Sequence, residues 1–323
     1  MRKFAAMAAI ATLAAAVSVS TAFAQDGPYV FVSGPLSDPY FGAIKAGADE
    51  AAKQLGITNY QYTTTPSYED IVPLYTRLVE SAIALKPSAI VLGNFFPDAL
   101  EPLIKQAADA GVAVVVHGSG RDTWRSLGAI GYVGEDSTLM GKFAGEAAAK
   151  AGVTDGVCVN TVGENPSVEQ RCQGYIDAIV AAGGKATMIA MNYQDNADPQ
   201  KQQQAIGALL NGDANLNGIF TVNPAVAITA VQAVKEANRK VTIATTDLSA
   251  AVVDAVKAGD VAFAVDQQPF LQGYYSMLIA YQYVKYGVKP ATEINSGPLI
   301  VDAKAADAVI NANKNYPGVR GGN

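Results

Sequence analysis

The chain has 323 residues, of which 50% are hydrophobic and 16% charged; 23 basic and 29 acidic residues give a formal net charge of -6. This acidic balance disfavours binding to nucleic acid or to anionic membrane surfaces, because both attract clusters of Lys and Arg. The length allows two domains of about 150 residues each, with enough buried surface for two cores.

The first 24 residues have the pattern of a secretory signal peptide. Arg2 and Lys3 form a charged start, an apolar segment follows, and Ala22-Phe23-Ala24 is a small-x-small cleavage pattern. No cysteine follows Ala24, so we expect no lipid attachment, and no later apolar run approaches the roughly 20 residues of a membrane helix. We therefore predict a soluble, exported mature protein of net charge -8, with 21 basic and 29 acidic residues.

After residue 24, short β-branched runs alternate with helical periods to the end of the chain, which predicts parallel sheets covered by helices on both faces. Phe41, Ile44, Ala48, Ala51 and Leu55 show the spacing of a buried helix face. No low-complexity linker divides the chain, so two domains would have to exchange strands. The runs expected as strands are 29–33, 59–63, 89–92, 112–116, 129–133, 157–161, 187–191, 218–222, 241–245 and 261–265.

Polar and aromatic residues follow these strands, and ligands of open parallel sheets bind beyond the carboxyl ends of the strands. The first such group is Ser37-Asp38-Pro39-Tyr40-Phe41. Carboxylates and amides can pair with neighbouring hydroxyls, and aromatic rings can cover the CH face of a sugar, so the set predicts a sugar or polyol site. The candidate ligand-binding residues are Asp38, Tyr40, Phe41, Asn94, His117, Ser119, Asn223, Asp247 and Gln267.

Several of these residues also have a structural interpretation. Asp38, Asn223 and Asp247 could instead cap the helices that follow them, since each has a side chain that accepts hydrogen bonds from a first helical turn. Asn94 could satisfy the backbone of a loop. Arg171 could contact a ligand or pair with a nearby acid, and we favour the acid.

The chain has two cysteines, Cys158 and Cys172, in a compartment where disulfides persist. We expect them to be bridged, which would close a 15-residue loop; the alternative is two buried free thiols. One histidine and no Cys-x-x-Cys pair disfavour zinc. A partial calcium-loop pattern from Asp213 has Pro224 where the bidentate glutamate should stand, so we expect an ordinary turn, no metal and no cofactor.

Catalytic motifs are incomplete. Gly118-Ser119-Gly120 follows a strand, but Thr123 occupies the third glycine position of a dinucleotide fingerprint, and there is no Gly-x-Ser-x-Gly elbow. We therefore expect no enzyme. The rival hypothesis is an exported sugar-modifying enzyme with Asp38 and Asp247 as acid and base. A transcription regulator on a similar core is disfavoured by the signal pattern and by the absence of a basic helix-turn-helix segment.

At these residues the chain resembles periplasmic sugar-binding proteins of the ribose-binding type, the soluble components of ABC importers. The resemblance covers residues 28 to 310, and the order and spacing of its motifs make it specific. The motifs are Asp38-Pro39-Tyr40-Phe41, Gly47, Ala51 to Gly56, Ala110 to Val115, Gly134-Glu135-Asp136, Arg171 to Tyr175, Asn223, Asp247, Gln267-Gln268-Pro269 and Gly273.

The resemblance implies an α/β fold of the type I periplasmic-binding-protein class, with two doubly wound parallel-sheet lobes joined by three crossovers. We expect lobes formed by 25–136 plus 269–294 and by 137–268 plus 295–310. The polar stretch from Asn311 to the glycines at 321 and 322 and Asn323 is expected to be a loosely held tail. The lobes would close on a ligand, and a membrane permease would read the closed form; a chemoreceptor is a second conceivable reader. We expect a monomer.

The resemblance also implies ligand contacts at Asp38, Tyr40, Phe41, Asn94, Asn223, Asp247 and Gln267. The sequence departs from the pattern in three places. Asp38 stands where asparagine is usual, Pro224 stands where aspartate is usual, and His117-Gly118-Ser119 replaces an Asp-Arg pair. These departures leave a sugar, a deoxy sugar, a polyol or another small polar molecule as the ligand.

Overall fold

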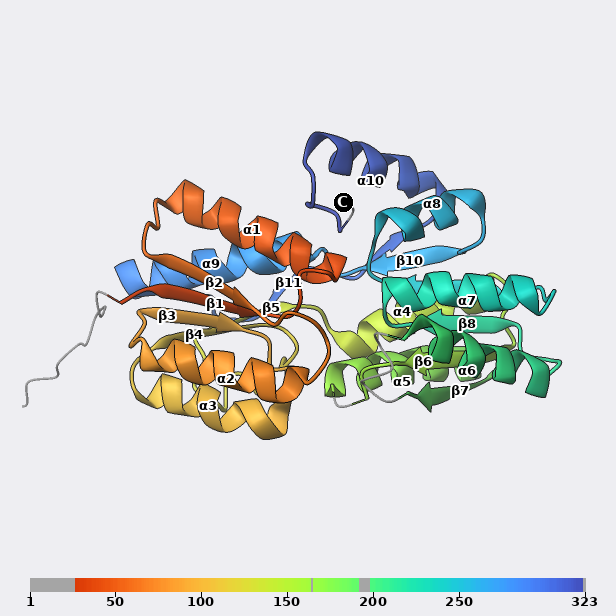
Figure 1. Ribbon diagram of the computed structural model, residues 1–323, viewed down its shortest axis with the longest axis horizontal. Helices are drawn as coiled ribbons and strands as arrows, with labels where there is room; N and C mark the ends of the chain where they lie inside the picture. Colours follow the sequence, from red (N-terminus) through yellow and green to blue (C-terminus); the bar gives the residue numbers. More distant parts are fainter. Residues whose placement is uncertain (1–26, 164, 192–197, 322–323) are drawn as a thin grey trace, which may run out of the picture.

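The computed structural model describes residues 27–163, 165–191 and 198–321, so the predicted signal peptide lies outside the described residues. The predicted α/β architecture is confirmed: two sheets, each with helices on both faces, lie side by side (Figure 1). All ten predicted strands are present, with ends shifted by a few residues, together with two short strands that the sequence pattern did not predict. No helix in these ranges is both long and apolar enough to cross a membrane.

The first sheet has the strand order β11-β5-β4-β3-β1-β2, and all its pairings are parallel. Helices α1 and α9 pack together, as do α2 and α3. Its elements are β1 (Tyr29–Ser33), α1 (Pro39–Leu55), β2 (Tyr60–Thr64), α2 (Ile71–Ala84), β3 (Ala89–Leu92), α3 (Pro97–Asp109), β4 (Ala113–Gly118), β5 (Gly131–Gly134), α9 (Pro269–Tyr286) and β11 (Ile294–Asn295).

The second sheet repeats this order as β12-β10-β9-β8-β6-β7, with β12 antiparallel to β10. Its elements are α4 (Ser137–Lys150), β6 (Asp155–Asn160), α5 (Pro166–Ala181), β7 (Lys185–Ala190), α6 (Pro199–Gly212), β8 (Gly218–Thr221), α7 (Pro224–Glu236), β9 (Thr242–Thr246), α8 (Ala250–Ala258), β10 (Phe263–Asp266), β12 (Leu299–Val301) and α10 (Ala303–Asn315). In each sheet the strand order reverses beside the first strand, between β1 and β3 and between β6 and β8. Such a switch point forms a crevice at the carboxyl ends of the strands.

The central strands are buried on both faces, as expected for parallel strands between two helical layers. Ala89-Ile90-Val91-Leu92 and the valines of β4 are almost without exposed surface. The chain passes between the sheets after β5, after β10 and after β11. We use the lobe boundaries expected from the sequence as working definitions of an N-terminal and a C-terminal lobe.

Helix α9 returns from the C-terminal lobe and packs closely on α1. A Cβ atom at Gly47 would lie 2.0 Å from the carbonyl oxygen of Phe270, and one at Gly273 would lie 2.0 Å from that of Ile44. Only glycine permits this approach. The N-terminal lobe is therefore completed by residues that follow the C-terminal lobe in sequence.

The stretch from Asn311 was expected to be a loosely held tail, but in the structure residues 311–321 are held against the C-terminal lobe. Helix α10 continues to Asn315, and Arg320 forms an ion pair with the buried carboxylate of Asp266. The helix starts within the C-terminal lobe, where Ala306 and Val309 are buried against the core, and it runs on without a break past Asn311. The sequence pattern alone showed only the polar outer face of this helix.

Cys158 on β6 and Cys172 on α5 form a disulfide. We expect reduction of this bond to lower the free energy of unfolding by about 3 kcal/mol, since the bond removes loop-closure entropy from the unfolded chain over a loop of about 15 residues. Melting curves with and without reductant, with thiol counts to show that the bond has opened, measure the effect. An unchanged melting temperature at two free thiols per chain would contradict the expectation.

Candidate functional site

A cavity lies between the lobes, at the switch points of both sheets. It contains about 630 Å³ of space between atoms, a volume that includes space open to solvent. From the N-terminal lobe it is lined by Asp38, Tyr40, Phe41, Tyr68, Ile71, Phe95, Phe96, Gly118 and Ser119. From the C-terminal lobe it is lined by Val162, Asn165, Val168, Arg171, Val222, Asn223, Asp247 and Gln267.

Asp38 lines the cavity and also begins helix α1. Its Oδ1 accepts a hydrogen bond from the backbone N–H of Tyr40 at 2.9 Å, which is an N-terminal cap. Its Oδ2 accepts from the hydroxyl of Tyr68 and, at 3.3 Å, from the side-chain amide of Asn223 in the other lobe. The capping interpretation is therefore correct, and it coexists with a place in the cavity. Burial raises the pKa of the Asp38 carboxyl, and these hydrogen bonds oppose the rise.

Aromatic rings from the N-terminal lobe form one wall of the cavity. The rings of Tyr40 and Phe41 meet edge to face at 5.0 Å, and Phe41 meets Phe95 at 5.7 Å. The Tyr40 hydroxyl donates to Gln272 Oε1 at 2.7 Å, so this ring is held from behind by helix α9. Edge-to-face contacts of this kind make a rigid apolar surface.

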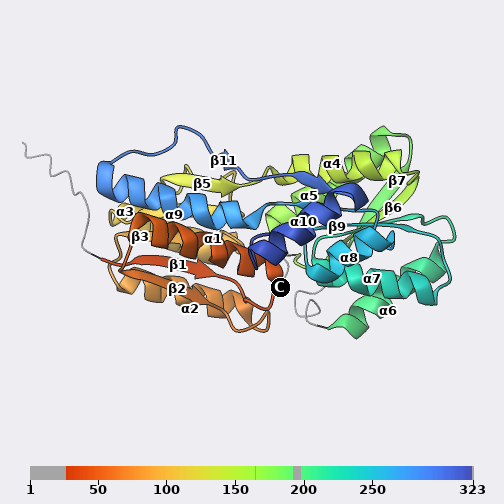
Figure 2. The same cartoon turned by 90° about the horizontal axis from the view of Figure 1, so that it is seen from above.

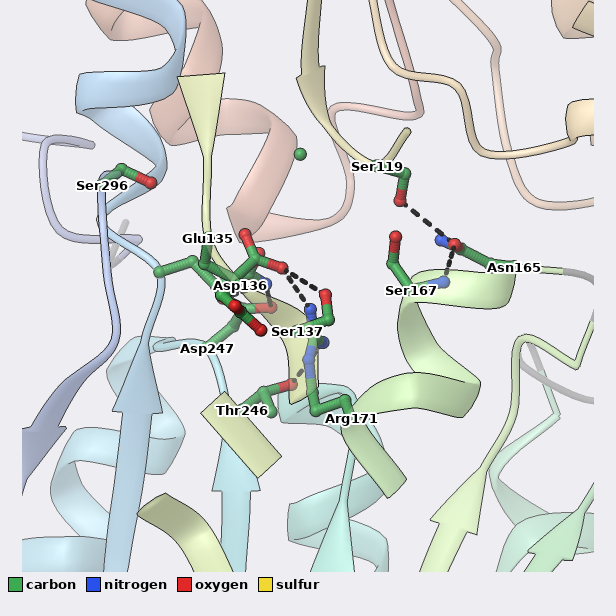
Figure 3. A network of polar contacts seen from close by, with 12 residues as sticks. Ser119, Glu135, Asp136, Ser137, Asn165, Ser167, Arg171, Thr246, Asp247 and Ser296 are labelled. Atoms are coloured by element: carbon green, nitrogen blue, oxygen red, sulfur yellow. Dashed lines mark hydrogen bonds and ion pairs between the residues drawn. The ribbon is translucent and has the colours of Figure 1, made fainter. Parts of the chain in front are cut away.

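Arg171 on α5 reaches into the cavity and pairs with Glu135, which lies in the first crossover (Figure 3). Its Nη2 lies 2.9 Å from Glu135 Oε1, and its Nη1 lies 3.4 Å from Thr246 Oγ1. Arg171 is 4% exposed and Glu135 is 1% exposed. Gly141 lets α4 approach α5 here, because a Cβ at that position would lie 1.9 Å from the Arg171 carbonyl oxygen. The expected pairing with an acid is present, and the guanidinium also faces the cavity.

Asp247 and Gln267 form a second polar group at the ends of β9 and β10. The Gln267 amide nitrogen donates to both carboxylate oxygens of Asp247, at 2.9 and 2.8 Å. Asp247 does not cap α8; the Ser249 hydroxyl does, accepting from the N–H of Val252. Burial raises the pKa of Asp247 well above its ordinary value; Arg171 opposes the rise, and the charge of Asp38 adds to it.

In addition to the pairing of Arg171 with Glu135, side-chain hydrogen bonds join the lobes across the cavity and its rim. Besides the contact of Asn223 with Asp38, Ser119 Oγ donates to Asn165 Oδ1 at 3.1 Å (Figure 3). At the rim, Gln170 Nε2 donates to Asp122 Oδ2 at 2.9 Å. Each of these contacts requires the two lobes to be close together. The structure is therefore a closed arrangement of the lobes.

Two predicted site residues do not line this cavity. His117 is completely buried within β4, its ring 5.2 Å from that of Phe31 and 5.9 Å from that of Phe95. Burial lowers the pKa of His117 to about 3. The prediction was wrong because β4 extends to Gly118, so His117 belongs to the strand and not to the loop after it.

Asn94 is the second such residue, and it faces a neighbouring cavity at the rim instead. Its side-chain amide donates to Glu101 Oε1 at 3.1 Å and to Thr123 Oγ1 at 3.3 Å. It thus ties helix α3 to the loop after β4. Its amide is therefore bonded to side chains, and not to the loop backbone that the sequence suggested as an alternative partner.

Sequence reasoning missed other residues that line the cavity, notably Tyr68 and Asn165. Tyr68 lies in the connection between β2 and α2, four residues after the strand ends, and contacts Asp38. Asn165 caps α5 through its Oδ1, which accepts from the N–H of Ser167 at 3.1 Å. Asn165-Pro166 repeats the Asp38-Pro39 and Asn223-Pro224 pairs, and this repetition was a usable signal.

The arrangement suits a small molecule with several hydroxyl groups. Carboxylates accept from hydroxyls, Arg171 and the amides donate to them, and the aromatic wall can cover an apolar ring face. Within the described residues, Arg171 Nε and Glu135 Oε2 are buried without a hydrogen-bond partner. Such atoms are satisfied when a polar ligand or water occupies the site.

Comparison with known proteins gives consistent results. Residues 29–288 match the family model described as a periplasmic binding protein domain. The ribose import binding protein of Haemophilus influenzae is 29% identical over 88% of this chain and 94% of its own. The D-ribose/D-allose-binding protein of Pseudomonas aeruginosa is 30% identical over 59% of this chain and 61% of its own.

Among solved structures, a carbohydrate transporter from Acidothermus cellulolyticus in complex with myo-inositol aligns with a TM-score of 0.82 and 28% identity. The alignment covers 91% of this chain and all of that one. A sugar-binding protein of a Bacillus halodurans ABC transporter aligns with a TM-score of 0.75 at 21% identity, which supports the fold.

Proposed function

The chain belongs to the periplasmic binding protein domain family, and from this membership we propose that it is the sugar-binding component of an ABC importer. It captures a monosaccharide or cyclic polyol between its lobes and delivers it to a membrane permease. The observation that carries the proposal is the cavity itself, which combines a carboxylate from each lobe with amides and a guanidinium from the C-terminal lobe and an aromatic wall from the N-terminal lobe.

The proposed ligand contacts are Asp38, Tyr40, Phe41 and Ser119 in one lobe and Asn223, Asp247 and Gln267 in the other. To these we add Arg171. Because both lobes contribute, a ligand makes all its contacts only in the closed form, and this difference drives closure. Moving the lobes from mostly open to mostly closed requires about 5.5 kcal/mol of differential binding.

The relatives support the ligand class. They include proteins named for ribose and for D-ribose or D-allose, and a solved structure that holds myo-inositol. All three molecules are small, uncharged and rich in hydroxyl groups. Such a ligand is consistent with a pocket whose polar groups are carboxylates, amides, hydroxyls and one guanidinium.

We expect one member of a panel of ribose, allose, arabinose, other hexoses, deoxy sugars and myo-inositol to raise the melting temperature of the mature protein. A ligand present at 100 times its dissociation constant and bound only by the folded state adds about 2.7 kcal/mol. Small-angle scattering of the same samples should show a smaller radius of gyration with the ligand bound. Glutamate serves as a small charged control.

Absence of any shift across the panel would contradict a sugar ligand, and an unchanged radius with a bound sugar would contradict closure. Turnover of the bound sugar would instead favour the rival enzyme hypothesis. Against that hypothesis, both carboxylates that would serve as acid and base already accept several hydrogen bonds, from Tyr40, Tyr68 and Asn223 at Asp38 and from Gln267 at Asp247.

The family membership also supports the partner and the compartment. We propose that the permease of an ABC importer receives the ligand, and that the signal pattern of the first 24 residues directs the chain to the periplasm. We also predict that the protein is a monomer. Recognition of the closed form by a chemoreceptor is a further prediction. Sedimentation of the mature protein tests the monomeric state.

A further inference from the structure

The C-terminal segment folds back against the junction of the two lobes (Figures 1 and 2). After α10 ends, the N–H of Arg320 donates to Asn313 Oδ1 at 2.9 Å, and the N–H of Val319 donates to the carbonyl of Tyr316 at 3.2 Å. The last described residues thus form a compact turn held on their own helix. We call residues 316–321 the C-terminal arm.

The arm is joined to the second crossover by one ion pair. Arg320 Nη2 lies 2.7 Å and its Nε 3.1 Å from Oδ2 of Asp266, the last residue of β10. Asp266 is 1% exposed, and its other oxygen accepts from the N–H of Gln268 at 2.7 Å. One buried carboxylate therefore fixes both the arm and the start of the crossover.

Between these two anchored residues stands Gln267, whose side chain lines the cavity and holds Asp247. The arm also reaches the neighbour of Asp247: a Cβ at Gly321 would lie 2.6 Å from the carbonyl oxygen of Leu248. The arm thus contacts Asp266, the neighbour of Gln267 in sequence. It also contacts Leu248, the neighbour of Asp247.

The backbone at these positions is strained. Asp247 has φ +65° and Gln268 has φ +52°, in the left-handed region that residues other than glycine seldom adopt. Such conformations persist only where the surrounding structure holds them. The ion pair of Arg320 with Asp266 and the packing of Gly321 on Leu248 supply contacts at both strained turns.

We propose that Arg320 is a positioning residue of the binding pocket: by pairing with Asp266 it fixes the backbone of Gln267, and through Gln267 the orientation of the Asp247 carboxylate. The inference rests on the proposed function, because it concerns the same pocket. It assigns a role in ligand binding to a residue that does not line the cavity. Pockets commonly need such outer contacts to hold the residues that touch the ligand.

The test compares Arg320→Gln with Lys257→Gln in the full mature chain. Lys257 on α8 pairs with Asp307 on α10, and neither residue lines the cavity, so its replacement removes a cation from the C-terminal lobe without removing a pocket contact. We expect Arg320→Gln to weaken binding of the sugar found in the panel by about tenfold, the factor typical of one charge-assisted hydrogen bond. Lys257→Gln should leave the affinity unchanged, and Arg320→Lys should restore part of it.

A second measurement does not depend on the ligand. In the ligand-free protein, hydrogen exchange of the Gln268 amide and of the segment 247–249 should be faster in Arg320→Gln than in the wild type and in Lys257→Gln. If wild-type protein binds no sugar, the proposed function fails while the exchange result still decides the positioning role. If the wild type binds sugar but Arg320→Gln changes neither affinity nor exchange at these positions, the positioning role is overturned and the function stands.

Loss of Arg320 leaves a buried carboxylate unpaired, which can prevent folding. If the single variant does not fold, the double variant Asp266→Asn with Arg320→Gln, which removes both charges, is tested in its place. We expect it to bind sugar more weakly than the wild type, with fast exchange at Gln268. Wild-type affinity and exchange in a folded double variant would overturn the proposal.

Discussion

Replacing Arg171 by leucine is expected to lower the free energy of unfolding by about 3–5 kcal/mol, because the change leaves the carboxylate of Glu135 buried without its partner. The two side chains are 5% and 0% exposed, so solvent screens their interaction little. The same change removes a donor from the cavity, and ligand binding should be lost as well. Denaturation by urea and calorimetric titration with the sugar measure the two effects separately.

A paired variant separates stability from binding. Replacing Arg171 and Glu135 together by leucine and glutamine removes both charges, and most of the stability should return, since substituting a whole buried pair is often neutral. Ligand affinity should not return, because Arg171 lines the cavity. A loss of less than about 1 kcal/mol in the single variant would indicate that the pair behaves like an exposed one.

Replacing Asp247 by asparagine is expected to change binding and stability in opposite directions. Affinity for the sugar should fall by about tenfold or more, since a charged acceptor becomes a neutral one. The melting temperature of the ligand-free protein at pH 7.5 should rise. Burial raises the pKa of this carboxyl in the folded state, so its ionised form destabilises the fold.

The pH dependence follows from the direction of this shift. Below the ordinary pKa of 3.8 the carboxyl is protonated in both states and the asparagine brings no gain. As the pH rises from 3.8 to the raised folded-state value, the unfolded state loses its proton first and the wild type loses stability relative to the variant. Above that value the difference is constant.

Melting curves of both proteins between pH 3.5 and 8 test the expected dependence. Asp254→Asn, at an exposed position on α8, is the matched control and should show little change in either property. A lower melting temperature for Asp247→Asn at pH 7.5 would show that the attraction between Asp247 and Arg171 outweighs the cost of burial. Unchanged affinity would remove Asp247 from the ligand contacts.

The architecture was largely predictable because its signal is periodic. Ten apolar runs separated by amphipathic helices specify two parallel sheets, whereas β11 and β12 are only two and three residues long and leave no pattern. Because these two strands are so short, the sequence pattern did not predict the third passage of the chain between the lobes, which runs from β11 to β12. That passage was expected only from the family resemblance. Local sequence therefore identified most strands but not the way in which the lobes share the chain.

The cavity was predictable where a side chain directly follows a strand and starts a helix, as Asp38 and Asn223 do. It was not predictable for His117, since a strand end uncertain by two residues decides whether a side chain faces a loop or the interior. Tyr68 lies in the connection before α2, and Arg171 lies within α5. Their place depends on how α2 and α5 pack, which sequence periodicity does not encode.

The close contact of α1 with α9 has a consequence for the order in which the protein is made. Helix α1 is synthesised more than 200 residues before the partner that covers it, as the positions of Gly47 and Gly273 show. While the ribosome extends the intervening lobe, the side of α1 that packs on α9 has no native partner. The N-terminal lobe thus cannot complete its core on the growing chain, and an unfinished, extended chain is the form that an export channel can thread.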